Sequence, residues 1–232
     1  EKRRGVGIAW GGFNVTEGGG DSAEVALELM PGNKIRKYDT WHAMGQGATT
    51  GSLVVTLEAL KEMHLTPEDI QLIQNDTKTC PDTGMAGASR SLYMDGNATI
   101  IAANKLLAAM RKEDGTLRTY DEMKAEGIET KYLGRYETNT TPGLCRLDPN
   151  TGIGDPTPAF TYCLNLAEVE VDTKTGKTTV LKFTCVDFVG RIGNIDAVNG
   201  QAYSGIMHGI GFALKEDYAD VKKHANMFGA GT

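Results

Sequence analysis

Residues 159–190 constrain the fold of this chain more than any other stretch. AFTYCLNLAEVEVD and KTTVLKFTCVDFVG alternate between apolar and polar residues with a period of two, and Thr173-Lys174-Thr175-Gly176 separates them. That alternation is typical of half-buried β-strands, and a short glycine-containing turn between two such runs predicts an antiparallel hairpin. An all-helical fold is therefore excluded.

The first half predicts a second hairpin followed by a strand–helix–strand unit. AEVALEL (23–29) and KIRKYDTW (34–41) flank a Pro-Gly-Asn turn. SLVVTLEALKEMH (52–64) carries its apolar residues on one helical face, and IQLIQN (70–75) is a short strand. Together these patterns indicate an α+β fold class, with mixed sheets and packed helices.

Two further helices are expected, at residues 91–111 and 200–214. Between them, residues 112–158 hold only short helical patterns and a polar stretch rich in Pro and Gly, which predicts a long surface excursion. We therefore divide the chain into residues 1–158 and 159–232. Gly205 and Gly209 lie four apart in the last helix and each costs about 1 kcal/mol against Ala, so we expect a close neighbour on that face.

Composition excludes several classes of protein. The chain has 232 residues, a net charge of −6 and 40% hydrophobic residues, which is typical of a globular protein rather than a disordered one. The negative charge disfavours nucleic-acid binding, and no apolar run is long enough for a membrane helix. Four scattered cysteines and four scattered histidines show no metal spacing and indicate reduced thiols in a cytoplasmic protein. Because the sequence lacks an initiator Met and ends in a glycine turn, we expect a piece of a longer chain.

HAMGQGATTGS (42–52) lies between a predicted strand and a predicted helix. Gly45 and Gly47 let the backbone approach a ligand, the free N–H groups of the helix start favour an anion, and Gln46 can both donate and accept hydrogen bonds. The loop lacks the lysine of a P-loop and misses the dinucleotide spacing, since the third glycine is Gly51. By itself the loop is equally compatible with a plain strand-to-helix turn.

Two further stretches of small residues adjoin predicted helices. In GMAGASR (84–90), Arg90 could grip a phosphate, or it could be a surface residue after a capping Ser89. In residues 200–214, hydrogen-bonding side chains accompany glycines that could equally serve helix packing. A large anionic ligand with several groups that contact separate loops would explain all three stretches jointly. No nucleophile–base constellation or paired carboxylates accompany them.

Four blocks carry a family resemblance. They are DTWHAMGQGATTGSLVVTLEALK, QNDTKTCPDTGMAGASRSLYMDGNATIIAANKLL, FTYCLNLAEVEVDTKTGKTTVLKFTCVDFVGRIGN and GQAYSGIMHGIGFALKEDY. Their order and spacing resemble the xanthine oxidase family of molybdenum hydroxylases, most closely its bacterial aldehyde oxidoreductases. The resemblance covers nearly all of this chain but only the middle of the molybdopterin-binding region of a family member.

The resemblance implies a fold and a set of cofactors. The fold would be part of the aldehyde oxidase/xanthine dehydrogenase molybdopterin-binding domain. Molybdenum would be held by the dithiolene of a molybdopterin, in its cytosine dinucleotide form, with no side chain ligating the metal. Two [2Fe–2S] clusters would lie on other parts of the parent protein. By motif, the resemblance assigns cofactor binding to Gly45, Gln46, Gly47, Gly87, Ala88, Ser89, Arg90, Gln201, His208, Gly209 and Gly211, with 208–211 at a helix start.

The resemblance also implies a reaction: an aldehyde or N-heterocycle is oxidised with water as the oxygen source, and electrons pass to the clusters. No catalytic residue is expected here, because the base glutamate would lie downstream, so the chain by itself is expected to be inactive. Met85 replaces an expected proline and Met207 a small residue. The implied partners are the remaining domains or subunits of a homo-oligomeric enzyme. The alternatives are a stand-alone pterin- or partner-binding module and a nucleotide-binding α/β domain.

Overall fold

The structure is a computed structural model that describes residues 1–16, 20–138 and 147–216. Cys145 and the glycine turn at 226–232 lie outside these residues. The chain forms two compact units. Among the described residues, one contains Glu1–Gly11, Cys163–Phe188 and residues 195–216, and the other contains Gly12–Tyr162 and Val189–Asn194. This division differs from the predicted boundary after residue 158, because the first strand pairs with a strand of the C-terminal hairpin.

The larger unit is built on a four-stranded mixed sheet in the order β4-β3-β2-β5. β2 and β3 are antiparallel and joined by a tight turn at Pro31–Asn33, β3 and β4 are parallel, and β5 is antiparallel to β2. The predicted hairpin and strand–helix–strand unit are both confirmed. The strands are β2 (Ser22–Met30), β3 (Lys34–Asp39), β4 (Ile70–Gln74) and β5 (Lys131–Glu137).

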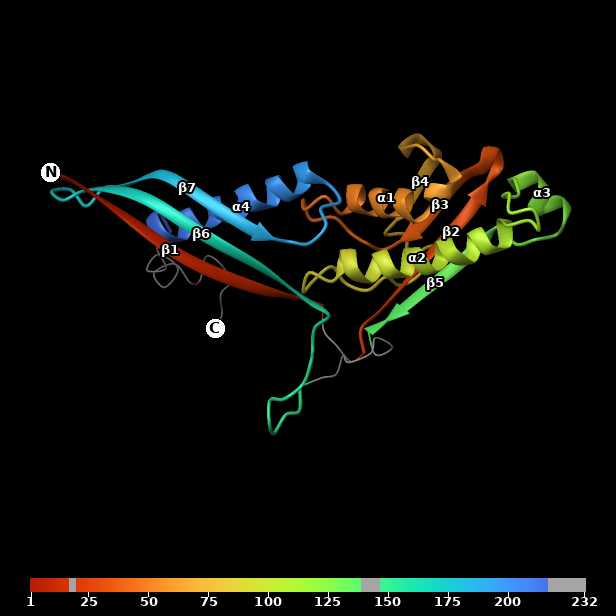
Figure 1. The fold of residues 1–232 in the computed structure, drawn as a ribbon, viewed down its shortest axis with the longest axis horizontal. Helices are drawn as coiled ribbons and strands as arrows, with labels where there is room; N and C mark the ends of the chain where they lie inside the picture. The colour runs from red at the N-terminus through yellow and green to blue at the C-terminus, as the bar shows by residue number, and fades with distance from the viewer. Residues whose placement is uncertain (17–19, 139–146, 217–232) are drawn as a thin grey trace. The chain divides into compact units, whose positions relative to one another are not determined.

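Helices α1 (Ala48–Ala59), α2 (Ser91–Met110) and α3 (Tyr120–Ala125) complete this unit. Helix α2 packs along β2 and β5, and α1 packs on α2 (Figure 1). β5 approaches α2 so closely that a Cβ on Gly134 would lie 2.0 Å from the carbonyl oxygen of Ala98. Glycine at position 134 therefore makes this helix–sheet contact possible.

The core of this unit lies between the sheet and α2. Alternate residues of β2, among them Val25, Leu27 and Leu29, have no exposed surface. They meet a helical face of α2 that includes Ala102 and Leu106. This arrangement follows from the two side-chain periods: every second residue of a strand faces the same side, and every third or fourth residue of a helix does so.

Two details of this unit differ from the sequence-based expectation. β5 was not predicted, because Gly134 and the flanking charges weaken its alternation, and its pairing with β2 and packing on α2 stabilise it instead. Helix α1 begins at Ala48 rather than Ser52. It begins directly after Gly47, the left-handed N-cap residue, and Gly51 in its first turn packs on Trp41, whose ring would lie 3.1 Å from an added Cβ.

The smaller unit is a three-stranded sheet in the order β1-β6-β7 with one helix, α4. Asp172 accepts hydrogen bonds from the backbone of Lys174 and Thr175 in the turn between β6 and β7, which confirms the predicted hairpin. The elements are β1 (Lys2–Val15), β6 (Ala159–Asp172), β7 (Thr178–Phe188) and α4 (Ile195–Leu214); the ends of β1 and β6 continue into the larger unit.

The glycines of α4 face open space rather than a close neighbour. A groove of about 500 Å³ is lined by α4, β6 and β7, and both Gly205 and Gly209 lie along it. An added Cβ at either glycine would have no atom within 4 Å among the described residues. The expected close approach to this face is therefore wrong within the part of the chain that the structure describes.

Candidate functional site

The first glycine loop, residues 42–47, links β3 to α1. Gly45 has φ +103° and Gly47, the N-cap residue of α1, has φ +85°, both in the left-handed region that favours glycine. The Gln46 side chain closes the loop on itself: its Oε1 accepts from the N–H of Met44 at 2.5 Å and its Nε2 donates to the carbonyl of His42 at 3.3 Å. One N–H of the Gln46 amide remains for a ligand.

The second loop, residues 82–89, leads into α2 and contains unusual backbone conformations. Ala88 has φ +48° and Ser89 has φ +52°, although neither is glycine. Each such residue costs about 1–3 kcal/mol and persists only where its surroundings impose the conformation. The carbonyl of Ala88 accepts a hydrogen bond from the N–H of Thr16 at 2.8 Å, which holds the loop in this shape.

The structure brings these two loops together. The backbone N–H of Thr40 donates to the hydroxyl of Thr83, and that of Thr83 to the hydroxyl of Thr40, each at 2.9 Å. His42 lies between the loops, with its Nδ1 3.0 Å from the carbonyl of Thr40 and its Nε2 3.4 Å from the N–H of Ala86. This pattern fits a neutral imidazole that donates from Nδ1 and accepts at Nε2. Sequence reasoning did not select His42, although it is the first residue of the first loop.

Arg90 holds the second loop from inside. Only 4% of this residue is exposed, so it is not a surface residue. Its Nε and Nη2 form a bidentate pair with Asp21, at 2.6 and 2.8 Å. The other N–H groups donate to backbone carbonyls of Ser22, Thr83 and Met85, at 2.7 to 2.9 Å. All five donors of the guanidinium therefore have acceptors within the chain, and none remains to grip a phosphate.

Two residues that sequence reasoning missed make this arrangement possible. At Gly84, which has φ +81°, an added Cβ would lie 2.7 Å from the guanidinium nitrogens of Arg90. Partial burial by itself would raise the pKa of Asp21, but hydrogen bonds from Arg90 and Thr16 outweigh it and hold that pKa below the ordinary 3.8. Asp21 is far from Arg90 in sequence, so no local pattern could have revealed the pair.

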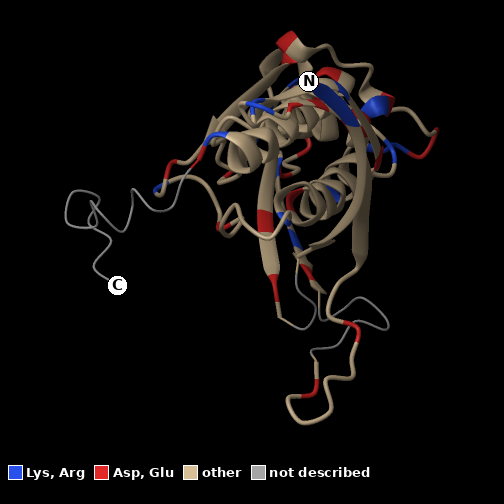
Figure 2. Ribbon diagram, turned by 90° about the vertical axis from the view of Figure 1, so that its left-hand side faces the viewer, with Lys and Arg blue, Asp and Glu red and all other residues tan. Residues whose placement is uncertain are grey.

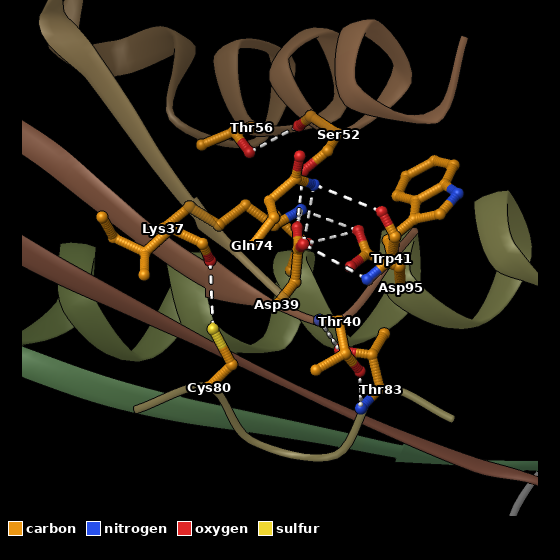
Figure 3. A network of polar contacts seen from close by, with 12 residues as sticks. Lys37, Asp39, Thr40, Trp41, Ser52, Thr56, Gln74, Cys80, Thr83 and Asp95 are labelled. Carbon is orange, nitrogen blue, oxygen red and sulfur yellow. Dashed lines mark hydrogen bonds and ion pairs between the residues drawn. The ribbon is translucent and has the colours of Figure 1, made fainter. Parts of the chain in front are cut away.

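A buried cluster of charges joins β3 to α1 and α2, the helices that follow the two loops (Figure 3). The side chains of Lys37, Asp39 and Asp95 have no exposed surface, and Lys37 Nζ lies 2.7 Å from Asp95 and 3.3 Å from Asp39. Asp39 also accepts from the Ser52 hydroxyl at 2.6 Å and from Gln74 Nε2 at 2.8 Å. A signal was present in the sequence, since residues 35, 37 and 39 share one face of a strand and two of them are oppositely charged.

The carboxylate of Asp95 is incompletely hydrogen-bonded, and the cluster has an excess of negative charge. Its Oδ1 accepts from Lys37 and, at 3.2 Å, from Thr99, whereas its buried Oδ2 has no hydrogen-bond partner among the described residues. Burial raises the pKa of Asp95 to about 6; the charge of Asp39 adds to the rise, and Lys37 opposes it. The cluster therefore carries one more carboxylate than cations when every group is ionised.

The third predicted stretch lies inside a helix. Gln201, His208, Gly209 and Gly211 all belong to α4, which runs without interruption from Ile195 to Leu214. The expected helix start at 208–211 is therefore wrong, because the backbone N–H groups there belong to the interior of a helix. The side chains of Gln201 and His208 are exposed, and this helix belongs to the smaller unit, whereas the two loops belong to the larger one.

The two loops offer backbone donors that can bind a ligand. The N–H groups of Gly45, Gly47 and Ala88 donate to no acceptor among the described residues. Exposed donors on a glycine cradle at the start of α1 suit a ligand that carries oxo, phosphate or ring-carbonyl oxygens. The described residues hold no group of three His, Cys, Asp or Glu that could ligate a metal and no helix able to cross a membrane. Figure 2 shows basic and acidic residues intermixed along the elements.

Comparison with known proteins gives consistent matches. A family model, the molybdopterin cofactor-binding domain, matches residues 1–228. Aldehyde oxidoreductase from Megalodesulfovibrio gigas is 40% identical over 229 residues, which cover 99% of this chain and 25% of that protein. The crystal structure of aldehyde oxidoreductase from Desulfovibrio desulfuricans matches the whole chain with a TM-score of 0.89 and 42% identity, and the match covers 25% of that chain.

A more distant structure shares the fold alone. Quinoline 2-oxidoreductase from Pseudomonas putida is 17% identical, with a TM-score of 0.69 over 90% of this chain and 30% of its own. The chain thus spans about a quarter of the length of the aldehyde oxidoreductases it matches.

Proposed function

This chain belongs to the molybdopterin cofactor-binding domain family, and from that membership we propose that it forms part of the cofactor site of a molybdenum hydroxylase acting on an aldehyde or an N-heterocycle. The observation that carries the proposal is the family match over residues 1–228 together with a pair of adjoining loops whose backbone donors meet no acceptor among the described residues. Such a group of backbone donors fits the oxygen atoms of an organic cofactor.

The residues of this chain have distinct roles in the proposal. Gly45, Gly47 and Ala88 present backbone N–H groups to the cofactor, and Gln46 adds the one amide N–H that its loop leaves free. Arg90 keeps the second loop in shape through Asp21 rather than touching the cofactor. When bound, the molybdenum centre supplies the two-electron oxidation of the substrate carbon, with water as the source of oxygen.

The other residues predicted from the sequence complete the proposal. Gly87 and Ser89 line the second loop next to Ala88, and Ser89 shares its left-handed backbone conformation. Binding of the cytosine dinucleotide form by Gln201, His208, Gly209 and Gly211 of α4 stays a prediction; the side chains of Gln201 and His208 are exposed and can donate hydrogen bonds. The chemistry that needs a base and the electron path through [2Fe–2S] clusters would be provided by other parts of the enzyme. The cytoplasmic location and the homo-oligomeric state of the enzyme remain predictions.

The proposal is tested on the protein as its gene encodes it, purified without added metal. Elemental analysis should find molybdenum and iron, and acid treatment should release an oxidised pterin together with cytidine monophosphate. Release of a guanosine nucleotide, or of no nucleotide, would change the proposed form of the cofactor and leave the proposed function standing. A protein that carries neither molybdenum nor pterin, or that carries bound NAD instead, would contradict the proposed function.

A further inference from the structure

The buried charge cluster connects the two candidate loops through the helices that follow them. Ser52 is the fifth residue of α1 and Asp95 is the fifth residue of α2, so each lies in the second turn behind its loop. Ser52 donates to Asp39, and Asp95 accepts from Lys37. Asp39 and Lys37 lie two residues apart on one face of β3, the strand that leads into the first loop.

Asp39 has two further contacts, one with β4 and one with the residues that follow β3. Gln74 of β4 donates to Asp39 at 2.8 Å, and the N–H of Trp41 donates to Asp39 at 3.3 Å. A core made only of apolar groups of similar size would be at least as stable, since burying ions is costly even when they are paired. Apolar contacts tolerate small sliding movements, however, whereas short hydrogen bonds and ion pairs fix the direction and spacing of the groups that they join.

We propose that Lys37 and Asp39 are positioning residues that set the spacing of the two loops by tethering α1 through Ser52 and α2 through Asp95. The inference rests on the proposed function, because the loops are taken to hold the molybdenum cofactor. Neither residue touches the cofactor. Their effect passes through the two helices to the backbone donors of Gly45, Gly47 and Ala88.

The first test cuts the tether to α1. Ser52→Ala removes one buried hydroxyl that reaches Asp39. Thr56→Val is the matched control, because it removes an equally buried hydroxyl one turn later whose one bond to the described residues goes to the carbonyl of Ser52 in the same helix. Molybdenum content is followed by elemental analysis over time during dialysis, and thermal unfolding is measured on the same samples.

We expect the cofactor to dissociate about tenfold faster from Ser52→Ala than from Thr56→Val at a similar unfolding temperature, since small displacements of binding groups have large effects. Equal dissociation from the two variants would overturn the inference and leave the proposed function standing. A wild-type protein that contains no molybdenum or pterin would overturn both.

The second test cuts the tether to α2 while keeping the charge balance. Lys37→Met alone leaves two buried carboxylates without a cation and can prevent folding. The double variant Lys37→Met/Asp95→Leu removes one cation and one anion together, and apolar replacement of a buried ion pair is often neutral for stability. Asp39 then has no cation beside it but keeps its hydrogen bonds from Ser52, Gln74 and the N–H of Trp41. We expect a folded protein that loses its cofactor about tenfold faster than wild type. Wild-type retention in the folded double variant would contradict a positioning role. If the double variant does not fold, the Ser52→Ala comparison decides.

Discussion

Replacing Asp95 by Asn should make the larger unit more stable at pH 8 and leave it nearly unchanged at pH 5. In the folded chain the pKa of Asp95 is about 6, whereas its ordinary value is 3.8. Between these two values the folded chain keeps a proton that the unfolded chain releases. The free energy of unfolding therefore falls as the pH rises from 3.8 to about 6, by about 3 kcal/mol for this group, and levels off above that.

The asparagine variant avoids this loss because it stays neutral at every pH. Its amide oxygen can still accept from Lys37 Nζ, which lies 2.7 Å from Asp95 Oδ1 in the wild type. Its amide hydrogens occupy the position of Oδ2, where no acceptor is found among the described residues, and that costs about 1 kcal/mol. The net gain at pH 8 should be about 2 kcal/mol.

Amide hydrogen exchange of β3 and α2, corrected for intrinsic rates, measures this gain within the protein as its gene encodes it. Lys37→Met provides a contrast of opposite sign, since it leaves both carboxylates without a cation and should cost about 3–5 kcal/mol at pH 8. If Asp95→Asn loses stability at pH 8, or keeps the wild-type dependence on pH, then the ionised carboxylate stabilises the fold and the reasoning about its burial is refuted.

Three further changes test the contacts that shape the site and the fold. Gly134→Ala should cost about 3 kcal/mol or more, or prevent folding, because its Cβ would lie 2.0 Å from the carbonyl of Ala98. Arg90→Lys should cost about 2–3 kcal/mol, since an ammonium cannot form the bidentate pair and reach three carbonyls. Thr119→Ala should cost about 1 kcal/mol through loss of the N-cap of α3. Denaturant unfolding checks all three.

Matched substitutions make these outcomes decisive. Gly7→Ala adds a methyl group where nothing lies within 4 Å, so it should have little effect. Arg135→Lys changes a half-exposed arginine whose ion pairs with Glu24 and Glu137 contribute at most about 1 kcal/mol. An Arg90→Lys variant as stable as Arg135→Lys would show that the buried hydrogen bonds of Arg90 do not hold the second loop.

The sequence by itself determined the elements whose signals are local. Alternation with a period of two identified both hairpins, and helical periodicity identified α1, because these patterns depend on residues only a few positions apart. The glycine loops could also be located, since left-handed turns favour particular residues. β5 escaped because its stability comes from pairing with β2 and from packing on α2, and Gly134 matters only where another backbone comes close.

The chemistry of the site was decided by tertiary structure. Asp21 lies 69 residues from Arg90, so only the fold reveals that the guanidinium is fully used within the chain. Lys37 and Asp95 are likewise separated by 58 residues, and their charges gain meaning only once both are removed from water. Local periodicity records which face of an element is buried. It does not identify the residue, distant in sequence, that a buried polar side chain contacts. That contact and the removal of both groups from water determine the charge, the hydrogen bonding and the role of each polar residue.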